Sequence, residues 1–328
     1  MNVSEQNKTR PGFSLRNALQ LLYVVSLIIA IVYGVEWVLA EPQEYQRDMY
    51  ISFAEYSAKY GRIEQALSEC RKASEYAPDD EHPYYIMGTI YQDKQKDIDS
   101  AILCYRKSIE LNPNAPWAYY RMGQCLLWTK KDTADAIAAW NSSAEFASKD
   151  YLLPLVALAG YYRDKRDFET STRLFKKTLS LNPRDFESAY GCALDYREMG
   201  MTDSFQIMLQ RAAGINSRRF EPYFHLGNLA FQKNDFKLAL NYFERSRQQN
   251  DSYNYSHHMI GVCLKAMGRE AEAIQSFQKS IELQPDYKQS WIELISVFRK
   301  IQKDKEVMAV FMQASKQFPS DPDFKLKK

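Results

Sequence analysis

The stretch that decides the fold is IGVCLKAMGREAEAIQSFQKSIELQP, at residues 260–285. Stretches with the same spacing of small and large residues recur along the chain, so one unit of about 34 residues is repeated eight times between positions 47 and 320. The loop ends of the units are Pro78, Pro113, Ser148, Pro183, Ser217, Asp251, Pro285 and Pro319. A fixed period of this length indicates a solenoid of stacked repeats rather than two separate domains.

Columns of small and large side chains predict that each unit is a helical hairpin. The first half carries a small residue at Ala54, Gly88, Gly123, Ala159, Ala193, Gly227 and Gly261, with a break at Ile295. The second half carries one at Ala66, Ala101, Ala136, Ser171, Ala239 and Ala273, with breaks at Phe205 and Val307. One helical turn later stand Cys70, Tyr105, Trp140, Phe175, Leu209, Phe243, Phe277 and Phe311. Small residues let paired helices approach closely, and the large side chain fills the space beside them.

These motifs resemble the tetratricopeptide repeat (TPR) family over about five-sixths of the chain. The resemblance implies an all-α fold, a TPR superhelix of about eight helix-turn-helix hairpins. It also implies that the first helices line a concave groove that binds other proteins. Because each hairpin contacts mainly its neighbours, the terminal hairpins expose a face that lacks a covering repeat.

Composition narrows the function classes. The 43 Lys and Arg side chains nearly balance the 41 Asp and Glu side chains, which disfavours nucleic-acid binding. The five cysteines, Cys70, Cys104, Cys125, Cys192 and Cys263, are widely spaced and show no metal-ligand pattern. We therefore expect no disulfide framework and no metal, and interpret the cysteines as small core residues.

An apolar stretch precedes the repeats. Residues 18–40 are almost uncharged and long enough for a transmembrane helix, which needs about 20 residues. The sequence thus predicts a short N-terminal tail over 1–17 and an uncleaved signal anchor over 18–40. A cleaved signal peptide and a buried core helix are the alternatives. Lys8, Arg10 and Arg16 before the stretch favour a cytoplasmic N-terminus, with the repeats on the non-cytoplasmic side of the membrane.

Carrying the family's groove positions onto this chain gives a candidate partner-binding site. Its aromatic members are Tyr85, Trp117, Tyr120, Trp128, Tyr190, Phe224, Phe231 and Tyr255, and its polar members are Arg163, Arg197, Asn228, Lys265 and Arg299. An aromatic and basic groove suits a peptide or protein segment with apolar anchors and acidic groups. The alternative for each aromatic residue is packing between first helices. A carboxylate clamp for chaperone tails is not expected, because only Asn228 matches its pattern.

No catalytic motif is present, and the four histidines lack the ordered partners that a general base needs. We therefore expect no enzyme activity and no cofactor. The leading hypothesis is a membrane-anchored scaffold for a protein or peptide partner. The alternatives are a non-catalytic subunit of a membrane enzyme or envelope assembly or secretion machine, and an organelle import receptor that faces the cytosol.

The C-terminal end carries a further expectation. After the eighth unit only a basic tail over residues 321–328 follows, and no polar capping helix is apparent. Met308 and Met312 of the last helix are then expected to be covered by the tail, a second copy or a partner. We hypothesise weak self-association through this end.

Overall fold

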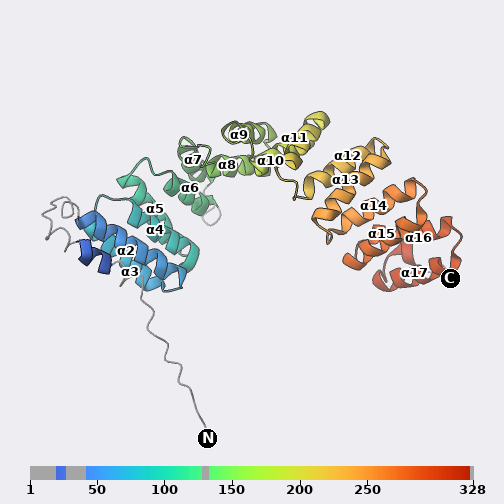
Figure 1. Ribbon diagram of the computed structural model, residues 1–328, viewed down its shortest axis with the longest axis horizontal. Coiled ribbons are helices and arrows are strands. Elements are labelled where there is room, and N and C mark those ends of the chain that lie inside the picture. Colours follow the sequence, from blue (N-terminus) through green and yellow to red (C-terminus); the bar gives the residue numbers. More distant parts are fainter. Residues whose placement is uncertain (1–19, 27–41, 128–132, 326–328) are drawn as a thin grey trace, which may run out of the picture. The chain divides into compact units, whose positions relative to one another are not determined.

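The computed structural model describes residues 20–26, 42–127 and 133–325 (Figure 1). The described residues are helical throughout and contain no β-strand. They divide into two compact units, Met1–Pro154 and Leu155–Lys328. The prediction of an all-helical TPR solenoid is confirmed.

The first unit holds three helix pairs and the start of a fourth. Its elements are α2 (Pro42–Lys59), α3 (Ile63–Tyr76), α4 (His82–Ile90), the π-helix η2 (Tyr91–Gln95), α5 (Ile98–Leu111), α6 (Pro116–Cys125) and α7 (Thr133–Ala144). α2 packs on α3, α4 on α5, and α6 on α7, and α3 and α5 each also pack on the helix that follows. Each hairpin is thus stacked on its successor.

The second unit continues the same order. Its elements are α8 (Leu153–Asp164, which contains the boundary), α9 (Phe168–Leu181), α10 (Phe186–Glu198), α11 (Thr202–Ile215), α12 (Glu221–Gln232), α13 (Phe236–Gln249), α14 (Asn254–Ala266), α15 (Glu270–Leu283), α16 (Lys288–Lys300), α17 (Asp304–Gln317) and the 3-10 helix η4 (Pro322–Phe324). From α9 to α17, every helix packs on the next along the chain.

The predicted small and large columns meet inside the hairpins. A Cβ atom added to Gly227 of α12 would lie 2.6 Å from Cε1 of Phe243 in α13. Gly261 of α14 and Phe277 of α15 stand in the same relation, at 2.7 Å. The absence of a side chain on the first helix therefore makes room for the ring on the second.

The turns inside the hairpins use two local devices. Gly200 and Gly268 adopt a φ of 72°, in the left-handed region that glycine tolerates best. Asp167 and Asp235 cap the following helices, because their carboxylates accept the backbone N–H of Thr170 at 3.1 Å and of Leu238 at 3.0 Å. The chain reverses direction within a few residues as a result.

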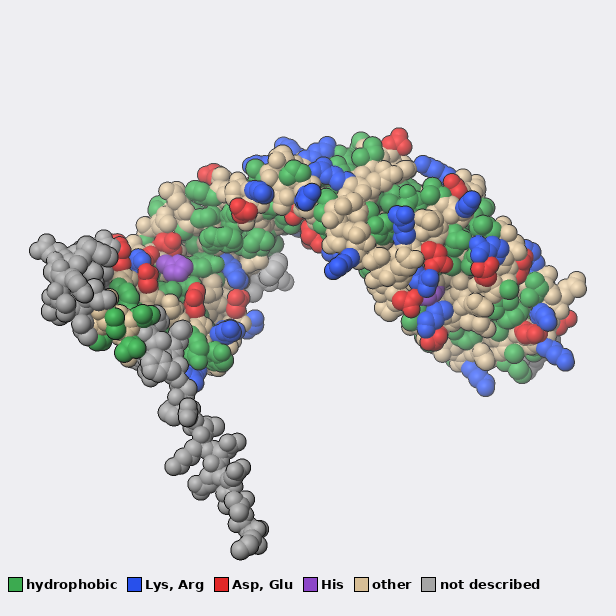
Figure 2. Space-filling model, viewed as in Figure 1, with side chains coloured by type: hydrophobic (Ala, Val, Ile, Leu, Met, Phe, Trp, Pro, Cys, Tyr) green, Lys and Arg blue, Asp and Glu red, His purple; other side chains and the backbone are tan. Residues whose placement is uncertain are grey.

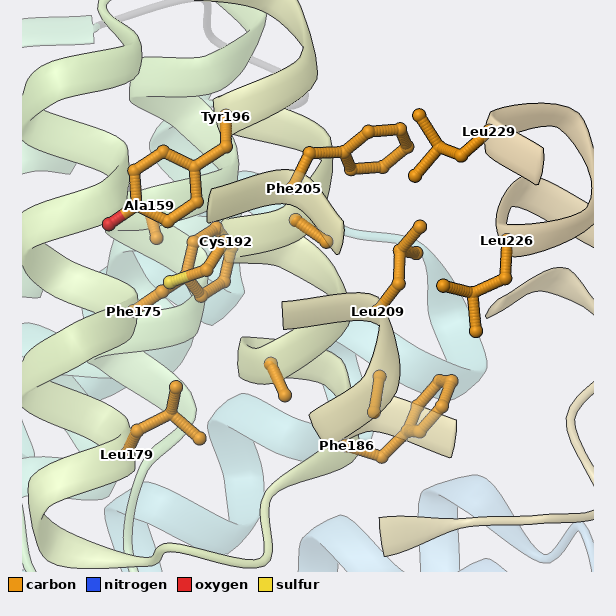
Figure 3. Close-up of a cluster of buried hydrophobic side chains, with 13 residues drawn as sticks. Ala159, Phe175, Leu179, Phe186, Cys192, Tyr196, Phe205, Leu209, Leu226 and Leu229 are labelled. Carbon is orange, nitrogen blue, oxygen red and sulfur yellow. The ribbon is translucent and has the colours of Figure 1, made fainter. Parts of the chain in front are cut away.

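The core is continuous from one hairpin to the next. Figure 3 shows a cluster in which Phe175 of α9, Cys192 of α10, Leu209 of α11 and Leu226 of α12 belong to four consecutive helices. Hydroxyl pairs cross the hairpin boundaries as well. Oγ of Ser246 lies 2.9 Å from Oγ of Ser256, and the pair Ser280 and Ser290 repeats this contact at 2.8 Å.

The C-terminal tail covers part of the last hairpin. Phe324 of η4 is only 3% exposed and packs with Trp291, Ile295 and Ala314. Oγ of Ser315 in α17 donates to the carbonyl oxygen of Phe324 at 2.6 Å. The break at Ile295 in the small column thus belongs to this terminal packing.

The predicted N-terminal tail and most of the predicted transmembrane helix over 18–40 lie outside the described residues. Residues 20–26 are helical, and Tyr23 stacks on Tyr45 of α2 with ring centroids 4.8 Å apart. Among the described helices, none combines the length and the apolar character that crossing a bilayer requires. The prediction of a membrane span is therefore not supported. An apolar run shows that side chains avoid water, and does not show which apolar surroundings they take.

Candidate protein-binding site

The cationic column of the predicted groove divides into two kinds of position. Nε of Arg163 lies 2.6 Å from Oδ1 of Asp195, and Nζ of Lys265 lies 2.7 Å from Oε2 of Glu293. In both pairs the carboxylate belongs to the first helix of the next hairpin. These two cations are thus neutralised within the chain.

The Asp195 carboxylate is fully buried. Its second oxygen accepts a hydrogen bond from Oγ of Ser171 at 2.6 Å, and the guanidinium of Arg163 lies over the ring of Phe175 at 4.8 Å. A buried charge needs such partners to offset its lost hydration. Arg163 therefore joins neighbouring hairpins rather than pointing to a partner.

Arg197 is the member of the column that opens onto a cavity. The cavity has a volume of about 370 Å³ and lies between α10, α11 and α12. Its lining residues are Arg197, Gly200, Thr202, Phe205, His225, Asn228, Leu229, Phe231 and Gln232. Three predicted groove residues, Arg197, Asn228 and Phe231, are brought together here. We call this cavity the α10–α12 cavity.

The lining gives the cavity a positive character. Arg197 is its one charged lining residue, because burial and the neighbouring Arg197 lower the pKa of His225 to about 4 and leave its imidazole neutral near pH 7. Arg197 pairs with Glu198 on its own helix at 3.0 Å, where both side chains are more than a third exposed. Exposed pairs of this kind contribute little, so the guanidinium can exchange partners.

The apolar wall comes from two adjacent hairpins. In Figure 3 the ring of Phe205 in α11 points toward Leu229 of α12. Phe205 stands where most second helices carry alanine or serine, and a ring there needs more room between the helices than a methyl group. Asn228, Gln232 and Thr202 add hydrogen-bonding groups. The arrangement fits an apolar side chain that lies next to an acidic group.

Other predicted aromatic residues pack mainly against rings of the chain. Phe224 lies 5.6 Å from Phe243, and Tyr255 lies 4.8 Å from Tyr287, between ring centroids. The hydroxyl of Tyr190 lies 3.1 Å from Nε2 of His225, which fixes this histidine at the cavity. The packing alternative thus accounts for Phe224 and Tyr255, while Tyr190 supports the cavity from behind.

The first unit holds a separate and smaller feature. Tyr85 and Trp117 line a cavity of about 110 Å³, and Trp117 is 45% exposed over Tyr151, with ring centroids 4.1 Å apart. Tyr120 accepts a hydrogen bond from Nε2 of Gln124 at 3.1 Å. Trp128 lies outside the described residues. Arg299 lines a different cavity, beside α17 and η4.

Sequence reasoning missed six lining residues of the α10–α12 cavity, Gly200, Thr202, Phe205, His225, Leu229 and Gln232. Phe205 carried a signal, since it interrupts the column of small residues. The others follow the ordinary pattern of their helices. Only the packing of α12 against α11 shows that they surround a space.

Lys and Arg side chains are interspersed with Asp and Glu side chains on the visible face of both units (Figure 2). Within the described ranges, no cluster of three His, Cys, Asp or Glu side chains is placed to hold a metal ion. The five cysteines form no disulfide there, and burial raises the pKa of Cys104 and Cys125 to about 11. Their interpretation as core residues is confirmed for all but Cys104, which is half-buried.

The hairpins and the lined cavity define a TPR protein of the kind that acts as a protein-interaction scaffold. Residues 94–127 match the family model described as TPR repeat, and residues 156–319, half of the chain, match the model described as Anaphase promoting complex subunit 8 / Cdc23. The chain belongs to this second family.

Two relatives show how far the likeness extends. Anaphase-promoting complex subunit 3 of Schizosaccharomyces pombe is 22% identical over 137 residues, which are 42% of this chain and 21% of that protein. The match therefore spans about a fifth of the relative's length. The solved C-terminal part of a TPR repeat-containing protein from Cytophaga hutchinsonii superposes with a TM-score of 0.61 and 15% identity, over 74% of this chain and 99% of that one. The second likeness shows the fold alone.

The predicted localisation is wrong. We expected a single-pass membrane protein with its repeats on the non-cytoplasmic side, from the apolar run and three preceding cations. The family match over residues 156–319 and the relative from Schizosaccharomyces pombe point away from that placement, and no described helix could cross a membrane. The charge asymmetry has meaning only if the run spans a bilayer, so the orientation argument falls with it.

Proposed function

We propose that the chain is a non-catalytic scaffold that holds a segment of a partner protein in the α10–α12 cavity. The observation that carries this proposal is the meeting of Arg197, Asn228 and Phe231 around one cavity. Arg163 and Lys265, at equivalent positions, receive a carboxylate from the next hairpin, whereas α12 offers Arg197 none. The partner segment would supply that carboxylate together with an apolar side chain for the wall of Phe205 and Leu229.

A photocrosslinking amino acid at Asn228 in the full chain, in cells, tests this function. We expect a discrete crosslinked partner whose yield falls about tenfold or more with Arg197→Glu, because a buried charge contact would become repulsive. A crosslinker at Ile207, which is 61% exposed on α11 but outside the lining, is the matched control and should give no such product. Equal products from both positions, or no effect of Arg197→Glu, would count against the cavity.

A second candidate follows from the family. The names of the matching family and of the relative describe subunits of the anaphase-promoting complex. This chain would then be a stoichiometric subunit of a multiprotein assembly rather than a free adaptor. Size-exclusion chromatography of a native extract distinguishes the two, since a subunit should elute only with its complex and an adaptor should also elute alone.

A further inference from the structure

The last second helix exposes apolar side chains that its counterparts cover or replace. Met308 and Met312 of α17 are 50% and 53% exposed. At the position of Met308, the earlier second helices carry side chains that are buried or half-buried, Leu67, Ile102, Ile137, Thr172, Gln206, Leu240 and Ile274. At the position of Met312 they carry polar residues, Arg71, Arg106, Asn141, Lys176, Gln210, Glu244 and Gln278. The face of α17 is thus built for contact.

The preceding hairpin shows what covers this face when it is occupied. Ala273, Ile274 and Phe277 of α15 pack in one cluster with apolar side chains of α16, Leu294, Val297 and Phe298. The residues 34 positions after the three α15 residues are Val307, Met308 and Phe311. These three line a cavity of about 440 Å³ together with Arg299, Pro322, Asp323 and Lys325. The same three positions therefore contact a helix in one hairpin and border empty space in the last.

The charges follow the same equivalence. Lys265 of α14 is neutralised by Glu293 of α16, and Nζ of Lys265 also donates to Oγ of Ser296 at 2.8 Å. Arg299 stands 34 positions after Lys265 and forms no ion pair within residues 42–127 and 133–325. Asp323 in the cavity lining is taken by Nζ of Lys288 at 2.6 Å. Arg299 thus borders the cavity without the carboxylate that its counterpart has.

We propose that this C-terminal face binds an amphipathic α-helix of a partner protein, in the place where a further first helix would stack. The partner helix carries an acidic residue that is followed directly by an apolar residue, with two more apolar residues at the fourth and fifth positions after the acid. This is the spacing of Glu293, Leu294, Val297 and Phe298 in α16. The acid pairs with Arg299, and the apolar residues cover Val307, Met308 and Phe311.

Charge favours a partner over a second copy of the chain. Arg299 and Lys325 line the cavity, and Lys305 and Lys316 are exposed on the same helix as the methionines. Two such faces would bring like charges together, which disfavours a symmetric contact. An acidic helix would instead be attracted and oriented by them.

A labelled peptide with the sequence of residues 288–300, KQSWIELISVFRK, is the probe, titrated into the full chain by fluorescence anisotropy. We expect saturable binding that Met308→Glu weakens about tenfold or more. Met267→Glu is the matched control, because Met267 is exposed to 39% outside this face. Met308 is itself exposed, so unchanged thermal melting of the Met308→Glu variant should show that its fold is intact.

A charge swap isolates the ion pair. The peptide variant Glu293→Lys should lose about tenfold in affinity for the wild-type chain and regain most of it with the Arg299→Glu chain. Absence of binding by the wild-type peptide, or no rescue by the swap, would overturn the proposal. So would concentration-dependent dimers that Met308→Glu abolishes, since the occupant would then be a second copy. Crosslinking at Asn228 does not involve this face, so the two proposals fail separately.

Discussion

At the scale of single residues, the close approach of paired helices depends on missing side chains. Gly227 faces the ring of Phe243 at a distance that leaves no room for a methyl group, whereas nothing lies within 4 Å of a Cβ atom added to Gly214 in α11. Both glycines are helical, so alanine would favour the backbone of each. The two sites should therefore respond in opposite directions.

We expect Gly227→Ala to lower the free energy of unfolding by roughly 1 to 3 kcal/mol through overpacking. Gly214→Ala should raise it by about 0.5 to 1 kcal/mol, from helix propensity alone. Urea unfolding followed by circular dichroism measures both. A stabilised Gly227→Ala variant would show that the ring of Phe243 moves aside at little cost.

Buried His258 makes stability depend on pH. Its Nδ1 lies 3.0 Å from Oγ of Ser290, and burial lowers the pKa of His258 to about 4. A pKa lower in the folded than in the unfolded state means that unfolding takes up a proton below about pH 6.5. Its contribution is thus complete above that pH and is lost as the pH falls toward 4.

Between pH 7 and pH 5 we expect the wild-type chain to lose roughly 1 to 2 kcal/mol of stability through His258. His258→Gln keeps a polar group near Ser290 and does not titrate, so its stability should fall less over this range. Chemical denaturation at the two pH values gives the comparison. Parallel losses in both proteins would assign the pH dependence to other groups.

At the scale of elements, two second helices begin with the same backbone geometry but different caps. Asp235 precedes α13 with φ −83° and ψ 74° and accepts the N–H of Leu238, while Met201 precedes α11 with φ −85° and ψ 72° and offers no side-chain acceptor. Asp235→Ala should cost about 1 kcal/mol, and Met201→Asp should gain a similar amount. Thermal melting of both variants tests the pair, and a neutral Met201→Asp would show that the N-terminus of α11 is already satisfied.

The hairpins could be predicted because each one repeats the same columns, so that errors at single positions average out. The cavities could not, because they arise where a column breaks. Phe205 and Val307 interrupt the same column of small residues, and each lines one of the two larger cavities. A break shows that packing changes there, but whether the added side chain fills the space or opens it depends on the next helix.

The candidate site shows the same limit for charges. Arg163, Arg197, Lys265 and Arg299 stand in one column of the sequence, yet two of them are neutralised by the following first helix. The carboxylates that do this come from different positions, Asp195 and Glu293, one helical turn apart in the repeat. No fixed spacing marks them, so only the structure separates the internal ion pairs from the cations that line cavities.

At the scale of the whole molecule, stability in a solenoid is shared between neighbouring hairpins, so a change at one end acts locally. Phe324 is the side chain through which η4 covers the last hairpin. Phe324→Ala should accelerate amide hydrogen exchange about tenfold or more in α16 and α17, because burying a phenylalanine contributes about 3 kcal/mol or more. Exchange in α10 and α12 should stay unchanged, and a uniform increase would indicate that the unit unfolds as one.

The hydroxyl pairs at the hairpin boundaries make the chain extendable. Ser246 with Ser256 and Ser280 with Ser290 join successive hairpins by the same buried contact at a separation of 34 residues. A second copy of residues 252–285, inserted directly after the first, would place Ser280 of one copy against Ser256 of the next. We expect the lengthened protein to fold with more helical signal in circular dichroism and an unchanged or higher melting temperature; a lower one would mean that the junction depends on features particular to each hairpin. The unit of design in this molecule is then the interval between two serines, which can be copied as a module.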